Sequence, residues 1–392
     1  MAGVISRGIQ GPIIREGDDI VDIVVKSVYA SEQADGYTLQ NRDVIAVTES
    51  VVARAQGNYV TVDQVAQDIR AKFPAKKLGL VFPILSRNRF SMCLKAIARA
   101  MDEVVVLFSY PNDEVGNPLM VRSAYLKNRY SGVYDFEEAD FVKTFGSPVH
   151  PFTGVNYLDF YREVIESEGA KATFLFSNDC RYIASYCDSI LCCDIHTRNE
   201  TRDVLQSMGK QVLTLADIMN APVDGSGYHE AYGMLGSNKA NEEKLKLFPR
   251  NCQPVVEGIQ ARIKAERGLD VEVMVYGDGA FKDPVGKIWE LADPVVSPAY
   301  TAGLEGTPNE LKLKYLADND FAALSGEALR DAIKDEIKKK DGSLVGKMAA
   351  QGTTPRRLTD LIGSLCDLTS GSGDKGTPIV YIQGYFDNYT TE

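Results

Sequence analysis

The sequence is poor in the residues and runs that mark several classes of protein. Among 392 residues it has one tryptophan, three histidines and seven cysteines, and the cysteines have no regular spacing. Such a pattern does not suit a zinc site and is typical of reduced thiols in the cytoplasm. No apolar run approaches the length of a membrane span, and the N-terminus lacks a charged-then-apolar signal pattern. We therefore expect a cytoplasmic protein that does not enter the membrane.

Two common nucleotide-binding motifs are also absent. No Gly-x-x-x-x-Gly-Lys-Ser/Thr run exists, which excludes a P-loop, and no Gly-x-Gly-x-x-Gly run opens a helix after a strand. Acidic residues exceed basic ones, giving a net charge of -11. Because proteins that bind nucleic acid present a basic face, nucleic acid is not expected as the main partner.

The composition is that of a globular protein longer than one typical domain. Hydrophobic residues make up 44% of the chain and charged residues 25%. Between residues 71 and 214, short apolar strands alternate with helical patterns, which implies a parallel sheet covered on both faces. The pair Cys192-Cys193 lies in one such apolar run and is interpreted as part of the core.

The predicted fold is α/β, with one domain inserted into another. A mixed α+β core is expected from residues 1–70 plus 215–392, and a doubly wound parallel α/β domain from residues 71–214. The expected strands of the insertion are Leu78–Leu85, Val104–Ser109, Ala172–Phe176, Ile190–Asp194 and Gln211–Leu213. The polar, aromatic segment Pro111–Pro148 is expected to be a long surface excursion, exposed at Asp113–Asn117.

A loop with ligand-binding character follows the apolar strand that begins at Val271. It contains Asp278, Gly279 and Lys282. A carboxylate can hold a metal ion, bare glycine backbone lets a phosphate approach, and a lysine offsets the phosphate charge. Strand ends of an α/β sheet are where ligands bind. The alternative for this loop alone is a plain Asp-Gly turn.

Two further loops have the same character. One, residues 220–228, offers Asp224 and Ser226 among glycines. The other follows a C-terminal helix, expected to begin near Thr354 and Pro355, and contains Gly371, Ser372 and Gly373. Asp367 lies near the end of that helix. In the functional interpretation, its carboxylate approaches a bound ion. The alternative is a solvated acidic face.

Several stretches of the chain resemble the coenzyme F420-0:L-glutamate ligase family. They cover about half the chain, and their order and spacing carry more weight than any one of them. The matching stretches are Gly11–Ile20, Asp43–Gly57, Asn220–Ser226, Val275–Lys282 and the C-terminal helix, loop and strand.

The resemblance implies a GTP- and metal-dependent ligase that adds γ-linked L-glutamate to a small carboxylate acceptor. Mg²⁺ or Mn²⁺ is the implied metal, and a homodimer is the implied assembly. By this resemblance Asp224, Asp278 and Asp367 hold metal. The remaining implied roles are phosphate binding by Arg54 and Lys282, and nucleotide contacts by Gly279, Gly371, Ser372 and Gly373.

The chain departs from the family pattern at four positions. Gly227 replaces an asparagine, and Gly279 replaces a threonine or serine. Arg54 and Lys282 replace a lysine and an arginine. Positive charge is kept at both basic positions, so phosphate binding is compatible with the changes. Loss of two polar side chains affects the expected metal geometry and substrate choice.

Candidate substrate contacts come from three segments. Ser226 belongs to the Asp224 loop. Glu305 and Asn309 lie in or beside a loop rich in proline, glycine and hydroxyls. Arg87 and Arg89 stand between a strand and a helix, where they could hold a phosphate or carboxylate. Loop structure and helix capping are the alternatives for these residues.

Two other functions remain open at this stage. The same aspartates could orient water in a metal-dependent phosphohydrolase of a small metabolite. A nucleotide-sensing protein that binds without turnover is the third possibility. Phosphate release that requires an amino-acid co-substrate distinguishes the ligase from both.

Overall fold

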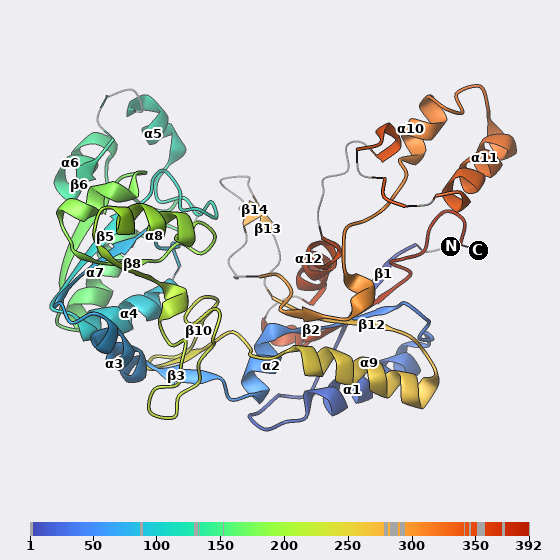
Figure 1. Cartoon of the computed structure of the whole chain (residues 1–392), viewed down its shortest axis with the longest axis horizontal. Coiled ribbons are helices and arrows are strands. Elements are labelled where there is room, and N and C mark those ends of the chain that lie inside the picture. Colours follow the sequence, from blue (N-terminus) through green and yellow to red (C-terminus); the bar gives the residue numbers. More distant parts are fainter. Residues whose placement is uncertain are drawn as a thin grey trace.

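The computed structural model describes residues 3–391, apart from several short segments. Those segments are residues 87–88, 129–131, 133, 152, 278–280, 283–288, 291–294, 341, 345, 351–356 and 371–372. The fold is mixed α/β, as predicted. Figure 1 shows two lobes, each built around its own sheet. In the part of the chain that is described, no helix is long and apolar enough to cross a membrane.

The first lobe is built on a five-stranded mixed sheet that joins the two ends of the chain. Its order is β1-β16-β2-β12-β15, and only β2 and β12 are parallel. The strands are β1 (Ile5–Ile9), β2 (Val44–Thr48), β12 (Glu272–Tyr276), β15 (Ala299–Tyr300) and β16 (Ile379–Gln383).

Helices cover both faces of this sheet because its central strands are apolar on both sides. Ile45 and Val47 of β2 pack in one cluster with α1 (Ile20–Asp35) and α9 (Gln253–Arg267). Val44 and Ala46 face the opposite way, toward α12 (Leu358–Ser370). Successive strand residues point to opposite faces, so an uninterrupted apolar run requires two covering layers.

Local signals fix where these helices begin and end. Asp19 caps α1 by accepting a hydrogen bond from the Asp22 amide at 3.0 Å. Gly36 ends it with a left-handed φ of 68°, a conformation that suits glycine. Thr61 and Gln64 form a reciprocal capping box at the start of α3 (Val62–Lys72), with bonds of 2.9 and 3.2 Å.

The second lobe contains a six-stranded sheet in the order β6-β7-β5-β4-β8-β9. All neighbours are parallel except β6 and β7. This agrees with the parallel arrangement predicted from the strand-helix alternation. The strands are β4 (Lys77–Val81), β5 (Glu103–Phe108), β6 (Phe136–Glu137), β7 (Lys171–Phe176), β8 (Ser189–Cys192) and β9 (Gln211–Thr214).

Helical segments cover the two faces of this sheet as well. One face packs against α3, α4 (Phe90–Ala100) and α7 (Tyr157–Ser167). The other packs against α8 (Arg198–Ser207) and the 3-10 segment Cys180–Ser185. Cys192 and Cys193 are buried and free, which confirms that they are core residues.

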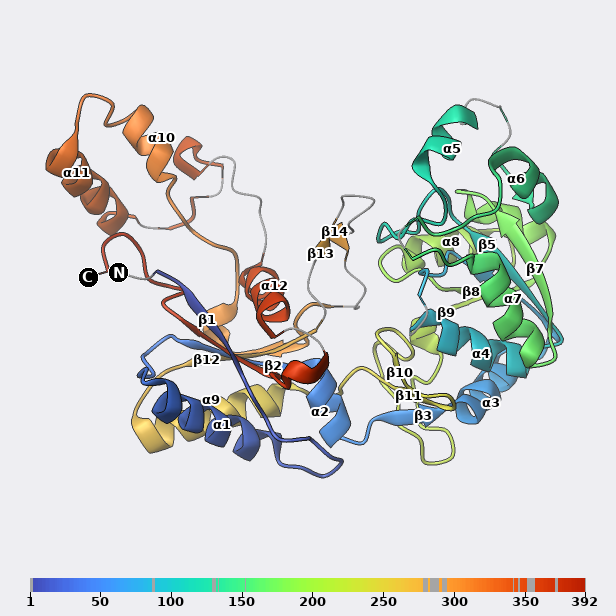
Figure 2. The same cartoon turned by 180° about the vertical axis from the view of Figure 1, so that it is seen from behind.

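A small three-stranded sheet and a short helix join the lobes (Figures 1 and 2). The order of this sheet is β10-β11-β3. Val60 of β3 and Leu245 of β11 share the core of the six-stranded sheet. The division at 71–214 stays a prediction. The joining elements are α2 (Glu49–Ala55), β3 (Tyr59–Thr61), β10 (Asn238–Asn241) and β11 (Lys244–Lys246).

The segment Pro111–Pro148 is more ordered than an irregular excursion. It contains α5 (Arg122–Asn128), β6 and α6 (Glu138–Phe145). Asp113 is buried rather than exposed and accepts hydrogen bonds from the amides of Leu85 and Asn117 at 2.9 and 2.7 Å. The expectation that Asp113–Asn117 is an exposed loop is therefore wrong, because the bond from Leu85 ties this loop to the segment after β4.

The remaining elements belong mainly to the C-terminal part of the chain. Two helices within residues 313–338 lie beside the first lobe (Figure 1). The expected helix start at Thr354 and Pro355 lies outside the described residues. The elements not yet named are η2 (Leu215–Asp217), β13 (Phe281–Lys282), β14 (Trp289–Glu290), η3 (Ala302–Leu304), α10 (Leu313–Asp318), α11 (Gly326–Lys338), η4 (Met348–Ala350) and η5 (Gly373–Lys375).

Candidate functional site

Two parallel strands of the central sheet end side by side. Thr48, the last residue of β2, pairs with Tyr276, the last residue of β12. Thr48 also caps α2, and its amide donates to the Pro378 carbonyl at 2.9 Å. The start of α2, the end of β12 and the segment before β16 therefore meet at one edge of the sheet, where α/β proteins bind ligands.

The end of α12 reaches the same edge. Tyr276 is buried, and its pKa is raised first by burial, with a smaller contribution from the negative charge of Asp367. Ser370 lies beside Tyr276 and donates to the Asp367 carbonyl at 3.2 Å. Asp367 is thus close to the end of β12. Asp278, the second residue after Tyr276, lies outside the described residues.

The Asp224 loop is held at the junction of the lobes. Asp224 has an exposed side chain and a left-handed φ of 47°. Its carbonyl accepts a hydrogen bond from Gln64 Nε2 at 3.3 Å. The Ser226 hydroxyl accepts from the Val223 amide at 3.0 Å and donates to the Gly227 carbonyl at 2.7 Å. Ser226 therefore stabilises the turn that presents Asp224.

Gly227, one of the departures from the family pattern, has a steric cause. A Cβ atom at this position would lie 2.5 Å from Asn58 Oδ1 and 2.7 Å from the Tyr59 amide nitrogen. No side chain fits without moving the backbone of β3. The asparagine of the family pattern cannot be accommodated in this packing, which the sequence alone did not reveal.

A buried asparagine links this loop to α2. Asn58 is 1% exposed; its Oδ1 accepts from the Tyr228 amide at 3.0 Å, and its Nδ2 donates to the Phe248 carbonyl at 2.8 Å. The Arg250 guanidinium lies 4.1 Å from the centre of the Tyr228 ring. The Arg250 amide donates to Gln56 Oε1 at 2.9 Å. These contacts fix the Asp224 loop to the carboxyl end of α2.

A buried ion pair crosses from α2 to the small sheet. Lys246 Nζ lies 3.0 and 3.1 Å from the two carboxylate oxygens of Glu49. Both side chains are less than 10% exposed. No local sequence pattern predicts this pair, because the residues are 197 positions apart. Its nearness to Thr48 makes it part of the framework of the candidate site.

The predicted phosphate-binding residues lie on or after these elements. Arg54 is exposed in the last turn of α2, and its carbonyl accepts from the Gly57 amide at 3.1 Å. Lys282 belongs to β13, and its side chain lies outside what the structure describes, as do Gly279, Gly371 and Ser372. Gly373 begins the short segment η5. Phosphate binding by this set stays a prediction.

The proposed metal ligands are only partly brought together. Asp367 lies at the sheet edge, whereas Asp224 is anchored near the opposite end of α2, a helix about 10 Å long. Within the described part of the chain, no group of three or more histidine, cysteine, aspartate or glutamate side chains could hold a metal ion. The described residues therefore do not complete a metal site without Asp278.

The predicted substrate contacts have other partners in the structure. Glu305 accepts from the Tyr300 hydroxyl at 2.7 Å. Asn309 holds the loop near residue 342, donating to the Gly342 carbonyl at 2.8 Å and accepting from the Leu344 amide at 2.9 Å. The Arg89 amide donates to Ser86 Oγ at 2.8 Å at the start of α4, in the second lobe. Arg87 lies outside the described residues.

The comparison with known families decides what kind of protein this is. The model of the F420-0:Gamma-glutamyl ligase family matches residues 8–384. The chain belongs to this family. Its matched residues run from β1 to the end of β16 and include the candidate sheet edge and the Asp224 loop. A search of curated proteins gives no match.

Membership of the γ-glutamyl ligase family agrees with the resemblance found in the sequence motifs. It implies ligase activity, with glutamate and an F420-type acceptor as the expected substrates. Several family motifs meet at one place in the fold. Asp43–Gly57 forms β2 and α2, Val275 lies in β12, and the C-terminal helix and strand are α12 and β16.

Proposed function

We propose that this protein is a nucleotide- and metal-dependent ligase that forms an amide between L-glutamate and a small carboxylate acceptor. The observation that carries the proposal is the family match over residues 8–384. The meeting of β2, β12 and α12 at one sheet edge supports it, because this edge brings several family motifs together.

The proposed reaction has two steps. A carboxylate oxygen of the acceptor attacks the γ-phosphorus of GTP, which gives an acyl phosphate and GDP. The glutamate amine then attacks the acyl carbon, phosphate leaves, and the amine loses a proton as the amide forms. The protein must hold two anionic substrates and offset their charge, so no protein nucleophile is required.

In the proposal, basic side chains and glycine backbone hold the anionic substrates and offset their charge. Arg54 and Lys282 offset phosphate charge, and the glycine-rich segment 371–373 lets the nucleotide approach the backbone. Asp278 and Asp367 would hold Mg²⁺ or Mn²⁺ at the sheet edge, and Asp224, anchored near the opposite end of α2, would bind metal from the other side of the site. Aspartate oxygens are the hard ligands that these ions prefer. The ion would supply further charge neutralisation to the transferring phosphoryl group.

A co-substrate screen tests this function. Purified protein is incubated with GTP or ATP, Mg²⁺ or Mn²⁺, and glutamate, and each candidate acceptor is added in turn. Mass spectrometry should detect a glutamate adduct, with phosphate release that requires both glutamate and acceptor. Phosphate release in the absence of both glutamate and acceptor would indicate a phosphohydrolase. Tight nucleotide binding without any release would indicate a sensor.

A further inference from the structure

The guanidinium of Arg250 is a partly buried cation beside the Asp224 loop. Arg250 stands between β11 and α9, and its guanidinium carbon lies 4.1 Å from the centre of the Tyr228 ring. Its Nε atom is buried and has no hydrogen-bond partner among the described residues. Within the same residues the guanidinium forms no ion pair. A partly buried charge without a counter-ion is costly, so an anion from outside the protein would stabilise it.

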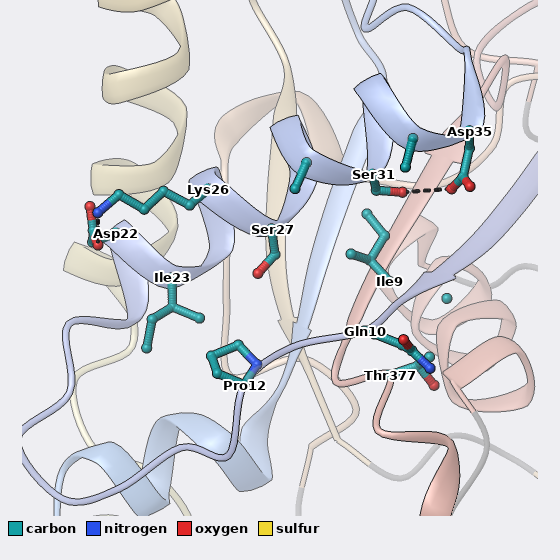
Figure 3. A pocket seen from close by; sticks show the side chains of 13 residues that line it. Ile9, Gln10, Pro12, Asp22, Ile23, Lys26, Ser27, Ser31, Asp35 and Thr377 are labelled. Carbon is teal, nitrogen blue, oxygen red and sulfur yellow. Dashed lines mark hydrogen bonds and ion pairs between the residues drawn. The ribbon is translucent and has the colours of Figure 1, made fainter.

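Comparable cations in two other places already have anionic partners. In the groove of about 710 Å³ between β1 and α1, Lys26 lies 2.7 Å from Asp22 (Figure 3). Arg267 also lies over a tyrosine ring, 4.5 Å from the centre of Tyr29, and is 3.5 Å from a carboxylate oxygen of Glu32. Stacking on an aromatic ring therefore does not by itself deprive a guanidinium of an anionic partner.

The backbone of Arg250 is fixed on both sides of the residue. Gln56 Oε1 accepts from the Arg250 amide at 2.9 Å, and Gln56 Nε2 donates to the Arg250 carbonyl at 2.5 Å. Pro249 precedes Arg250, and Asn251 follows it in the left-handed region, with a φ of 45°. Because few backbone conformations satisfy these contacts, the side chain is positioned before a ligand arrives, which lowers the entropy lost on binding.

Arg250 lies where two stretches shared with the family meet. Gln56 is the C-cap of α2, and Tyr228 ends the Asp224 loop. Asn58 joins the two segments, because its Oδ1 accepts from the Tyr228 amide at 3.0 Å. The family model spans all of these residues. The cation therefore lies beside the candidate site rather than on a remote surface.

The neighbouring histidine does not supply positive charge. His229 Nδ1 accepts hydrogen bonds from the Ala231 and Tyr232 amides at 3.2 and 3.1 Å, so this nitrogen carries no proton. Burial lowers the pKa of His229, the charge of Arg250 lowers it further, and the charge of Glu230 opposes the shift. The imidazole is therefore neutral at pH 7, and Arg250 is the cation of this cluster.

The proposed reaction leaves the carboxylates of glutamate without an assigned cation. The acceptor carboxylate attacks the γ-phosphorus, so it lies against the nucleotide, where Arg54 and Lys282 are proposed to offset charge. Glutamate reacts only through its amine, and both of its carboxylates stay ionised throughout. Arginine is the side chain whose paired N–H donors match the geometry of a carboxylate.

We infer that Arg250 binds one carboxylate of L-glutamate, with Tyr228 holding the guanidinium in place. This inference rests on the ligase function proposed above. The terminal nitrogens of the guanidinium donate in parallel to the two carboxylate oxygens. The aromatic ring attracts the cation and covers one of its faces, so the donors at its edge keep a fixed direction. Arg250 is thus assigned to the choice of amino-acid substrate and takes no part in bond making.

Steady-state kinetics of the ligase reaction test this contact. Arg250→Met should raise the KM for glutamate at least about tenfold and leave kcat and the KM for GTP little changed, because the contact is the same in the ground state and the transition state. Arg250→Lys should give a smaller rise, since lysine keeps the charge without the paired donors. Arg267→Lys, at the other stacked guanidinium, should change neither constant. A rise confined to the KM for GTP or the acceptor would overturn the assignment.

Equilibrium binding separates this inference from the ligase function. Isothermal titration with L-glutamate, L-glutamine and L-isoglutamine, with GDP and Mg²⁺ present, needs no turnover. The analogue that lacks the bound carboxylate should bind the wild type at least about tenfold more weakly than glutamate does. Arg250→Met should bind glutamate and this analogue alike, because the two losses remove the same contact.

The two experiments together distinguish the possible failures. This binding pattern without ligation in the co-substrate screen would keep the glutamate site and reject the proposed function. Ligation with glutamate binding unchanged in Arg250→Met would reject the glutamate site alone. A wild-type protein that binds no glutamate in the titration would also reject the site.

Discussion

Glu49 and Lys246 form a buried ion pair that joins the first helix after β2 to the strand β11. Lys246 Nζ lies 3.0 Å from Glu49 Oε1, and the side chains are 9% and 6% exposed. The pair spans the junction between the lobes, at the end of α2 that meets the candidate sheet edge. Because neither charge is well solvated, each depends on the other.

Removing one partner of this pair should destabilise the protein strongly. Lys246→Met leaves the Glu49 carboxylate buried without its cation, and the expected loss is about 3–5 kcal/mol. Glu49→Gln combined with Lys246→Met should cost less than Lys246→Met alone. Urea denaturation followed by circular dichroism measures both. As a control, Lys239→Met breaks an exposed pair and should cost less than about 1 kcal/mol. Equal losses in all variants would contradict this account.

The metal assignment predicts the effect of neutralising the proposed ligands. Asp224→Asn and Asp278→Asn should each abolish metal-dependent nucleotide binding and leave the fold intact. Asp367→Asn should have a smaller effect. Isothermal titration with Mg²⁺ or Mn²⁺ in the presence of GTP measures the binding. Unchanged metal titration in the Asp224 and Asp278 variants would reject the assignment.

Arg54 should contribute charge rather than a specific shape. Arg54→Lys should keep much of the activity, whereas Arg54→Ala should weaken triphosphate binding by about 1.5–3 kcal/mol. Lys282→Arg and Lys282→Ala should behave in the same way. Binding of the free nucleoside should change little in every variant. Equal losses for nucleoside and triphosphate in a calorimetric titration would show that these side chains do not touch phosphate.

Asp194 should make the free energy of unfolding decrease as pH rises from 3.8 to about 6. It is fully buried, its Oδ1 has no hydrogen-bond partner among the described residues, and burial raises its pKa from 3.8 to about 6. The folded state then holds the proton more tightly than the unfolded state. This stabilisation is full below pH 3.8 and is lost as pH rises through about 6. At neutral pH the raised pKa lowers the free energy of unfolding by about 2–3 kcal/mol.

Asp194→Asn tests this by removing the titration while keeping the shape. The Thr197 and Thr201 hydroxyls, each 2.7 Å from Asp194 Oδ2, can still donate to the amide oxygen. The urea midpoint of the variant should vary less between pH 5 and 8 than that of the wild type. Lys210 lowers the pKa of the exposed Asp188, so Asp188→Asn should leave the slope over this range unchanged. An unaltered slope in Asp194→Asn would refute the prediction.

Much of the fold could be predicted from local patterns. The apolar runs at β4, β5 and β7 are buried on both faces, and such runs alternating with helical periods require a covered parallel sheet. The burial of residues in the loops between strands and helices was less predictable. Asp113 is buried where it accepts a hydrogen bond from the Leu85 amide, 28 residues away, and this tertiary bond has no local sequence signal.

The candidate site was only partly predictable for the same reason. Motifs named the loops around Asp224, Asp278 and Asp367, because glycine and carboxylate spacing is a local property. Sequence alone did not show that β2 and β12 are adjacent and parallel, because more than two hundred residues separate the two strands. It also did not show that Gly227 packs against Asn58.

The sequence by itself determined the family, the α/β class and the identity of the candidate loops. These follow from residue type, order and periodicity, which act over a few turns of chain. Only the tertiary structure decided that Lys246 neutralises Glu49 and that β1 is left at an edge. Such relationships depend on which distant segments pack together, because burial and pairing are properties of the assembled sheet rather than of any one strand.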